Sequence, residues 1–132
     1  MTRLIAALTA LSLAAGAGAA QAEGDPENGA KVFRKCAACH TVEAEGPRRA
    51  GPNLHSVPGR TVGSLEGFSY SNALKAAGEA GDTWTDEQLD AFLADPRAMY
   101  KGHKMSFAGL KKEEERRDLI AYLHSQAPEA AE

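Results

Sequence analysis

The only two cysteines of this 132-residue sequence lie in one short motif, Cys36-Ala37-Ala38-Cys39, and His40 follows directly. Two thiols three residues apart, with an imidazole beside them, can serve several kinds of chemistry. A structural disulfide, a redox-active dithiol, a zinc site and covalent attachment of a haem all use these residue types. The residues around the motif decide among them.

Three of these interpretations fit the surroundings poorly. A disulfide within C-x-x-C closes too short a loop to stabilise much. A thioredoxin-like dithiol opens a helix after a strand, and no βαβ pattern surrounds Cys36. A zinc site would need further Cys or His residues at matching spacing. C-x-x-C-H is typical of haem attachment, in which both thiols bond the vinyl groups of one porphyrin, so we interpret His40 as the proximal iron ligand.

A helix is expected to position this motif. Asp25 can cap the N-terminus of that helix, and Pro26 suits its first position. Phe33, Cys36 and His40 follow at i, i+3 and i+7, which turns them toward one side. Both thiols would then reach the same porphyrin, with the imidazole under its iron.

The composition after residue 22 also favours a large apolar cofactor. Val, Ile, Leu and Phe make up 17 of these 110 residues, which is below the level of roughly 20% at which a charged chain starts to look disordered. A buried haem would replace the missing side-chain core. It would also explain residues 41–70, a long stretch rich in Gly, Pro and Arg, because so long a loop in a small domain is usually functional.

The other periodic segments predict an all-α fold of short helices. We expect a helix over residues 71–77 that ends at Gly78, and a second helix after a capping box that begins at Thr85. Asp95-Pro96 can start another turn, and residues 111–126 form the clearest helix. No segment carries a strong strand signal. These helices and the long loops are expected to wrap around one covalently bound haem.

Residues 1–22 have the features of a secretory signal peptide. Arg3 precedes an apolar stretch, and Ala20-Gln21-Ala22 matches an A-x-A cleavage site. We predict that residues 1–22 are cleaved and that residues 23–132 form a single domain outside the cytoplasm. An uncleaved anchor is the alternative, but the strongly apolar part is short.

Net charge and hydropathy exclude two classes of protein. The formal net charge of −3 and the pI near 5.8 argue against a nucleic-acid-binding protein. After residue 22 no apolar run is long enough to span a bilayer, so we expect no stable membrane insertion.

The charges are unevenly distributed along the chain. Residues 79–95 contain six acids and no base, whereas residues 97–112 contain five bases and no acid. Such runs usually mark solvated faces. The basic run, however, brackets Met105, and a basic patch on an acidic protein can steer it toward an acidic partner.

Sequence spacing alone does not decide which residue binds the iron opposite His40. Met105 lies in an irregular stretch after Gly102, where a thioether can reach inward without disturbing a helix. Lone methionines are more often core filler than ligands. The candidates are Met99, Met105, His55, His103 and His124.

A series of motifs in order resembles the class I c-type cytochromes, the group of mitochondrial cytochrome c and soluble bacterial electron carriers. The resemblance covers Gly24 to about Ser125. The matching stretches are Gly24-Asp25, Cys36-Ala37-Ala38-Cys39-His40, Gly51-Pro52-Asn53-Leu54-His55, Gly59-Arg60, Gly67-Phe68-Ser69-Tyr70, Thr83-Trp84, Lys104-Met105-Ser106-Phe107-Ala108-Gly109 and Asp118-Leu119-Ile120-Ala121-Tyr122-Leu123.

The resemblance implies roles for individual residues. Met105 corresponds to the distal ligand, and the Pro52 carbonyl to the acceptor of the proximal His40 Nδ1–H. The side chains that correspond to donors around the inner haem propionate are Arg60, Tyr70 and Trp84. Where the first and last helices cross, Gly29 and Phe33 are expected to pack against Leu119 and Tyr122.

Several residues depart from the family pattern, and His103 is one of them. The family often has Thr where His103 stands. His103 is therefore expected to be either a propionate donor or an exposed side chain.

The function implied is that of a periplasmic one-electron carrier with haem c, attached through Cys36 and Cys39, and not of an enzyme. We expect a monomer that docks transiently on membrane redox complexes. Its donor would be a cytochrome bc complex or a dehydrogenase, and its acceptor a terminal oxidase, a reductase or a photosynthetic reaction centre. The alternative is a haem peroxidase-like enzyme active after loss of the Met ligand, for which His103 is the only distal acid–base candidate.

Overall fold

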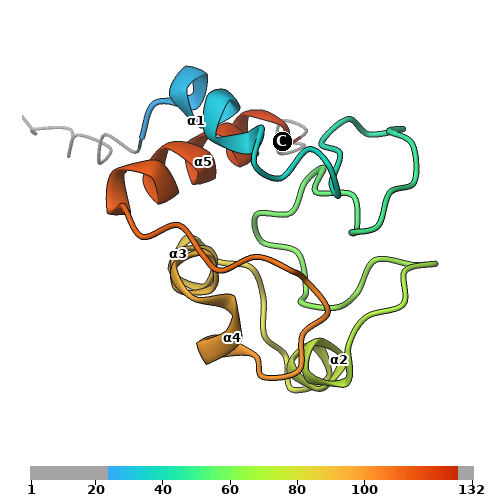
Figure 1. The fold of residues 1–132 in the computed structure, drawn as a ribbon. Helices are drawn as coiled ribbons and strands as arrows, with labels where there is room; N and C mark the ends of the chain where they lie inside the picture. The colour runs from blue at the N-terminus through green and yellow to red at the C-terminus, as the bar shows by residue number, and fades with distance from the viewer. Residues whose placement is uncertain (1–23, 128–132) are drawn as a thin grey trace, which may run out of the picture.

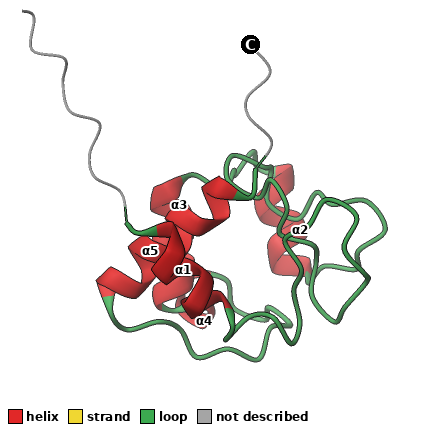
Figure 2. Ribbon diagram, turned by 90° about the horizontal axis from the view of Figure 1, so that it is seen from above, coloured by secondary structure: helices red, strands yellow, loops and turns green. Residues whose placement is uncertain are grey.

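Helices and long loops alternate along the chain (Figure 1). The computed structural model describes residues 24–127, so the predicted signal peptide lies outside the described residues. The helices are α1 (Pro26–Phe33), α2 (Asn72–Glu79), α3 (Asp86–Ala94), α4 (Pro96–Met99) and α5 (Glu113–Ser125). Between residues 24 and 127 the β-structure is limited to an isolated bridge that pairs Thr61 with Thr83. Figure 2 shows helices and loops in this part of the chain, with no strand. The expected all-α architecture is therefore confirmed.

Short polar side chains begin four of the helices, and the sequence predicts three of these starts, at Asp25, Thr85 and Asp95. The carboxylate of Asp25 accepts hydrogen bonds from the second and third residues of α1, and the Ser71 hydroxyl caps α2. Thr85 accepts from the Gln88 N–H at the start of α3, and Asp95 caps α4. Each cap provides an acceptor for N–H groups that have no partner within the helix.

Two helix ends differ from the sequence-based expectation. The first helix ends at Phe33, and the motif that begins at Cys36 continues in tighter turns in which the Cys36 N–H donates to the Phe33 carbonyl. Gly78 lies inside α2 and does not end it. A Cβ at Gly78 would lie 2.0 Å from the Val62 carbonyl oxygen, so this glycine serves a close approach of two backbones and not a helix stop.

Helices α1 and α5 cross in direct contact (Figures 1 and 2). Gly29 makes the contact possible, because a Cβ there would lie 2.0 Å from the carbonyl oxygen of Asp118 and 2.7 Å from the Cβ of Tyr122. The ring of Phe33 packs at 5.5 Å, centroid to centroid, from that of Tyr122. The expected crossing of the first and last helices is thus confirmed.

A buried carboxylate joins the same two helices. Asp118, 5% exposed, accepts the Asp25 backbone N–H at 2.8 Å and the Asn28 side-chain N–H at 2.5 Å. The hydrogen bonds from Asn28 and from the Asp25 backbone lower the pKa of Asp118 below its ordinary value.

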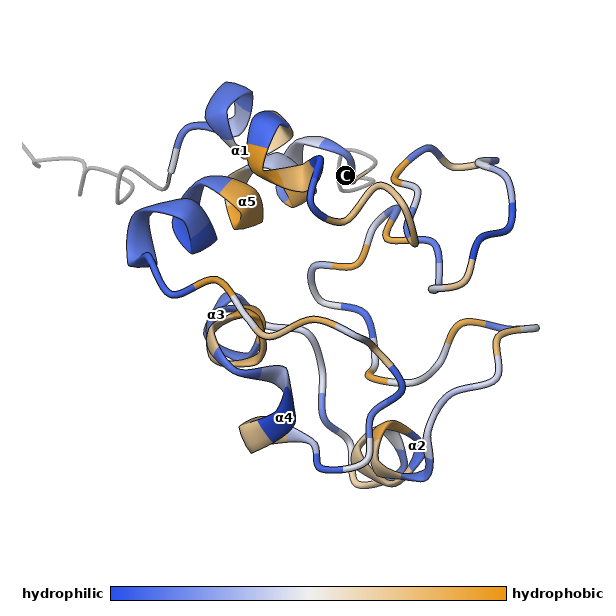
Figure 3. Cartoon of the chain, viewed as in Figure 1, coloured by the Kyte–Doolittle hydropathy of each residue, from blue (hydrophilic) through white to orange (hydrophobic). Residues whose placement is uncertain are grey.

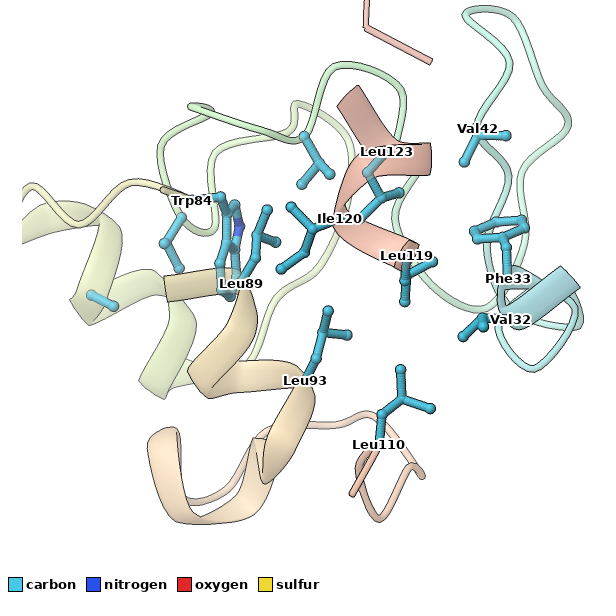
Figure 4. Packing of buried hydrophobic residues seen from close by; sticks show 13 residues of the cluster. Val32, Phe33, Val42, Trp84, Leu89, Leu93, Leu110, Leu119, Ile120 and Leu123 are labelled. Atoms are coloured by element: carbon cyan, nitrogen blue, oxygen red, sulfur yellow. The ribbon is translucent and has the colours of Figure 1, made fainter. Parts of the chain in front are cut away.

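The buried apolar cluster takes residues from α1, α3 and α5, and Figure 3 shows hydrophobic residues on each of these helices. Leu119, Ile120 and Leu123 of α5 belong to the same buried cluster as Leu89 and Leu93 of α3, and Figure 4 shows Ile120 extending toward Leu89. Trp84, just before α3, completes this side of the cluster. Within residues 24–127, no helix is both long and apolar enough to cross a membrane.

Substitution of Gly29 by Ala is expected to destabilise the protein by about 2 kcal/mol, because the new methyl group overlaps the α5 backbone and overpacking costs roughly 1–3 kcal/mol. Denaturant unfolding of the haem-loaded protein measures this. Ala30→Ser, at the exposed neighbouring position, is the control and should stay close to the parent. Equal unfolding midpoints for the parent and Gly29→Ala would contradict the close crossing.

Substitution of Asp118 by Asn is expected to change how stability depends on pH. The pKa of Asp118 is lower in the folded protein than in the unfolded chain. Its stabilisation is therefore fully present above about pH 4, the ordinary range of a carboxyl group, and is lost as the pH falls through the folded value. At pH 7 the variant should be less stable by about 1–2 kcal/mol.

This difference should shrink in acid, and urea unfolding of the holoprotein between pH 7 and pH 3 measures it. Glu66→Gln removes an exposed loop carboxylate and should leave the acid limb of the profile unchanged. A stability gap for Asp118→Asn that is constant over this pH range would argue against the role of the charge.

Candidate functional site

One large cavity collects the eight residues predicted to hold the haem. It lies among the end of α1, the loop of residues 41–70, α3, the segment of residues 103–107 and α5. Large apolar side chains make up much of its wall. The cavity lining includes all eight predicted site residues: Cys36, Cys39, His40, Pro52, Arg60, Tyr70, Trp84 and Met105.

The imidazole of His40 is fixed by its backbone surroundings. Its Nδ1–H donates to the Pro52 carbonyl oxygen at 2.8 Å. Gly51 lies against the ring, where a Cβ would be 2.5 Å from His40 Cε1. Burial lowers the pKa of His40, with a further contribution from the charge of Arg60, while the bond to Pro52 acts in the opposite direction. The ring is therefore neutral near pH 7, and its Nε2 lone pair is free to bind a metal.

The thiols of Cys36 and Cys39 precede this ring in the chain, and they do not form a disulfide with each other. Cys36 and Cys39 are both free, and Cys39 is the more exposed. Burial raises the pKa of Cys36, although the neighbouring Lys35 lowers it. The His40 N–H donates to the Cys36 carbonyl at 2.9 Å, so the turn that carries the thiols also carries the imidazole into the cavity.

Another part of the wall carries hydrogen-bond donors. Arg60 donates to the backbone carbonyls of Asn53 and His55, and burial lowers the pKa of its guanidinium. The Tyr70 hydroxyl accepts the Leu65 N–H at 3.2 Å, which leaves its own proton to donate. The indole of Trp84 also lines the cavity. A cation and two donors in an apolar wall suit a buried carboxylate.

The segment that carries Met105 is anchored on both sides of it. Lys104 Nζ donates to the Ser69 carbonyl oxygen at 3.3 Å, which joins this segment to the loop of residues 41–70. Further on, the Leu110 N–H donates to the Leu93 carbonyl at the end of α3 at 2.7 Å. The irregular conformation that the sequence predicts for Met105 is therefore held by contacts with two other parts of the fold.

The structure separates the candidates for the position opposite His40. Met105 and His103 line the cavity, whereas the other three do not. Met99 ends α4. His55 Nδ1 lies 2.9 Å from the Val42 carbonyl, and His124 Nε2 lies 2.6 Å from an Asp86 carboxylate oxygen.

Several contacts at the cavity were not predicted from the sequence. The bridge from Lys104 to Ser69 and the approach of Gly51 to His40 join segments that are distant along the chain or depend on backbone geometry. A pattern of residue types carries no signal for either. The hydrogen bond between the Met105 N–H and His103 Nδ1 was also missed, although a polar side chain two residues before an unpaired N–H is a recognisable turn signal.

These features fit a covalently attached haem. The apolar wall suits a porphyrin, the paired thiols suit thioether bonds, and His40 offers a free ring nitrogen. Arg60, Tyr70 and Trp84 suit a propionate. Residues 24–127 contain no cluster of three His, Cys, Asp or Glu side chains that could hold a metal ion by itself, so a zinc-type centre does not fit these residues.

Comparison with known proteins agrees with this fit. Residues 26–127 match the cytochrome c family. Cytochrome c-550 of Ancylobacter novellus is 49% identical over 98 residues, which cover 74% of this chain and 92% of the relative. Cytochrome c2 of Agrobacterium tumefaciens is 43% identical over 101 residues, covering 76% and 91%. Cytochrome c of Gibberella zeae is 48% identical over 103 residues, covering 77% and 94%.

The fold is also shared with a solved structure. Cytochrome c2 from Rhodospirillum centenum superposes with a TM-score of 0.75 at 40% sequence identity, covering 80% of this chain and 100% of that one. The family match spans nearly all of the described residues, and the cavity offers the thiols and the imidazole that haem attachment requires. The chain therefore belongs to the cytochrome c family, as a class I c-type cytochrome with covalently attached haem c and the function of an electron carrier.

Proposed function

We propose that this protein is a periplasmic one-electron carrier in which Cys36 and Cys39 hold the haem and His40 and Met105 bind its iron. The observation that carries the proposal is that all four side chains line a single apolar cavity. Of the candidates opposite His40, Met105 offers a thioether, the ligand that together with His is typical of electron-transfer cytochromes.

The side chains around the cavity are suited to this task. When bound, the haem supplies an iron that accepts and releases single electrons. The Pro52 carbonyl holds the His40 ring in one tautomer and orientation. The apolar wall excludes water, and the cation of Arg60 would offset the charge of a haem propionate. None of these residues transforms a substrate.

The partners proposed are membrane redox complexes with an acidic docking surface. The donor would be a cytochrome bc complex or a dehydrogenase, and the acceptor a terminal oxidase, a reductase or a photosynthetic reaction centre. The cations at residues 97–112 support this, because Lys101 and Lys104 are exposed near Met105 in the chain and Lys104 lines the cavity. Such contacts are small and transient, and the protein would act as a monomer.

Spectroscopy of the ferric holoprotein tests the ligand set. We expect a sulfur-to-iron charge-transfer band that disappears in Met105→Ala, together with a fall in reduction potential of at least about 60 mV, which corresponds to a tenfold loss of preference for the ferrous state. Met99→Ala removes a methionine that does not line the cavity and should keep the band. Persistence of the band in Met105→Ala would refute Met105 as the ligand.

Electron-transfer kinetics test the docking surface. Lys101→Gln removes an exposed cation next to the cavity segment and should lower the second-order rate constant with membranes of the source organism about twofold to fivefold at low salt. Lys75→Gln, an exposed position on α2 outside the basic run, is the matched control. High salt should remove the difference. Equal rates for both variants at low salt would count against this surface.

A further inference from the structure

His103 lies two residues before Met105 and contacts its backbone. The Met105 N–H donates to His103 Nδ1 at 3.1 Å. Nδ1 accepts this bond, so the lone pair of that ring nitrogen faces the Met105 N–H. His103 is half-buried and lines the cavity together with Met105.

This hydrogen bond is unusual within its segment. A turn precedes it, in which the His103 N–H donates to the Tyr100 carbonyl at 3.3 Å and Gly102 adopts a φ of +81°. From Lys104 to Gly109, the N–H of Met105 is the one backbone N–H with an acceptor among the described residues. The other contact close to Met105 is the exposed bond from the Lys104 side chain to Ser69.

The imidazole that accepts this bond is itself held by aromatic neighbours. Its ring lies 6.3 Å, centroid to centroid, from that of Phe92 on α3 and meets it edge-on at 75°. Phe92 in turn packs on Trp84 at 5.0 Å and on Tyr100 at 6.0 Å. The acceptor for Met105 is therefore supported by α3 and not by the loop alone.

We propose that His103 is a positioning residue, which holds the Met105 backbone through Nδ1 and thereby keeps the thioether in place toward the haem iron. This inference rests on the proposed function, because it requires Met105 to be the iron ligand. The role differs from the two that the sequence leaves open for His103, since neither a propionate donor nor an exposed side chain needs the bond to Met105.

Competition by an added ligand tests the proposal on the ferric holoprotein. Imidazole displaces the thioether, and the charge-transfer band reports the fraction still bound. In His103→Ala the Met105 N–H loses its acceptor, and we expect imidazole to bind about fivefold more tightly, the factor that corresponds to one typical hydrogen bond. Cyanide provides a second, smaller competitor and should show the same order of variants.

Two further variants separate this role from simple loss of a side chain. His103→Asn keeps an oxygen that can accept an N–H two residues on and should restore an imidazole affinity close to that of the parent. Ala108→Ser changes an exposed residue of the same segment that does not line the cavity and should also match the parent. Equal imidazole affinities for the parent and His103→Ala would overturn the proposal. So would a His103→Asn variant that binds imidazole as tightly as the Ala variant.

The outcomes also separate this inference from the ligand assignment. Absence of the charge-transfer band in the parent protein would mean that Met105 is not the ligand, and both proposals would fail. If the parent shows the band and imidazole binds equally well with Ala, Asn or His at position 103, the carrier function is retained. Only the proposed role of His103 then fails. If His103→Ala does not retain haem, the parent is compared with His103→Asn alone. An imidazole affinity of His103→Asn equal to that of the parent supports the bond, and an affinity about fivefold tighter contradicts it.

Discussion

The structure depends on one constraint: a chain with few large aliphatic side chains must enclose an apolar cofactor. Many of the residues that form its core also face the cavity. Leu119 and Leu123 of α5, Leu89 of α3 and Phe33 of α1 belong both to the buried cluster and to the cavity wall. The haem and the side-chain core therefore share one apolar surface, and the burial of each supports the other.

Because large apolar side chains are few, contacts with the backbone position many parts of the fold. Glycines allow close approaches of α1 to α5, of the 41–70 loop to His40, and of α2 to Val62. Carbonyl groups accept from His40, Arg60 and Lys104. Such contacts position the loops without large buried side chains, which explains how a long segment without regular structure can form a defined wall.

The sequence predicted the helices and the cavity residues well, because both leave local signals. Asp25, Ser71 and Thr85 begin helices where their residue types favour caps, and the attachment motif is specific for its chemistry. The ends of α1 and α2 were less predictable, since the role of Gly78 depends on Val62, which approaches it only in the folded chain. The contact of His103 with Met105 depends on a turn at Gly102, and side-chain orientation at such a turn is not encoded in periodicity.

The pairing of α1 with α5 has a consequence for the order of events during synthesis. The hydrogen bond between Asp25 and Asp118 joins positions 93 residues apart. A chain that emerges N-terminus first exposes α1 and both thiols long before α5 exists to cover that helix. Helix α1 and both thiols are therefore made well before α5, and the crossing of the two helices can form only after residues 113–125 have been made.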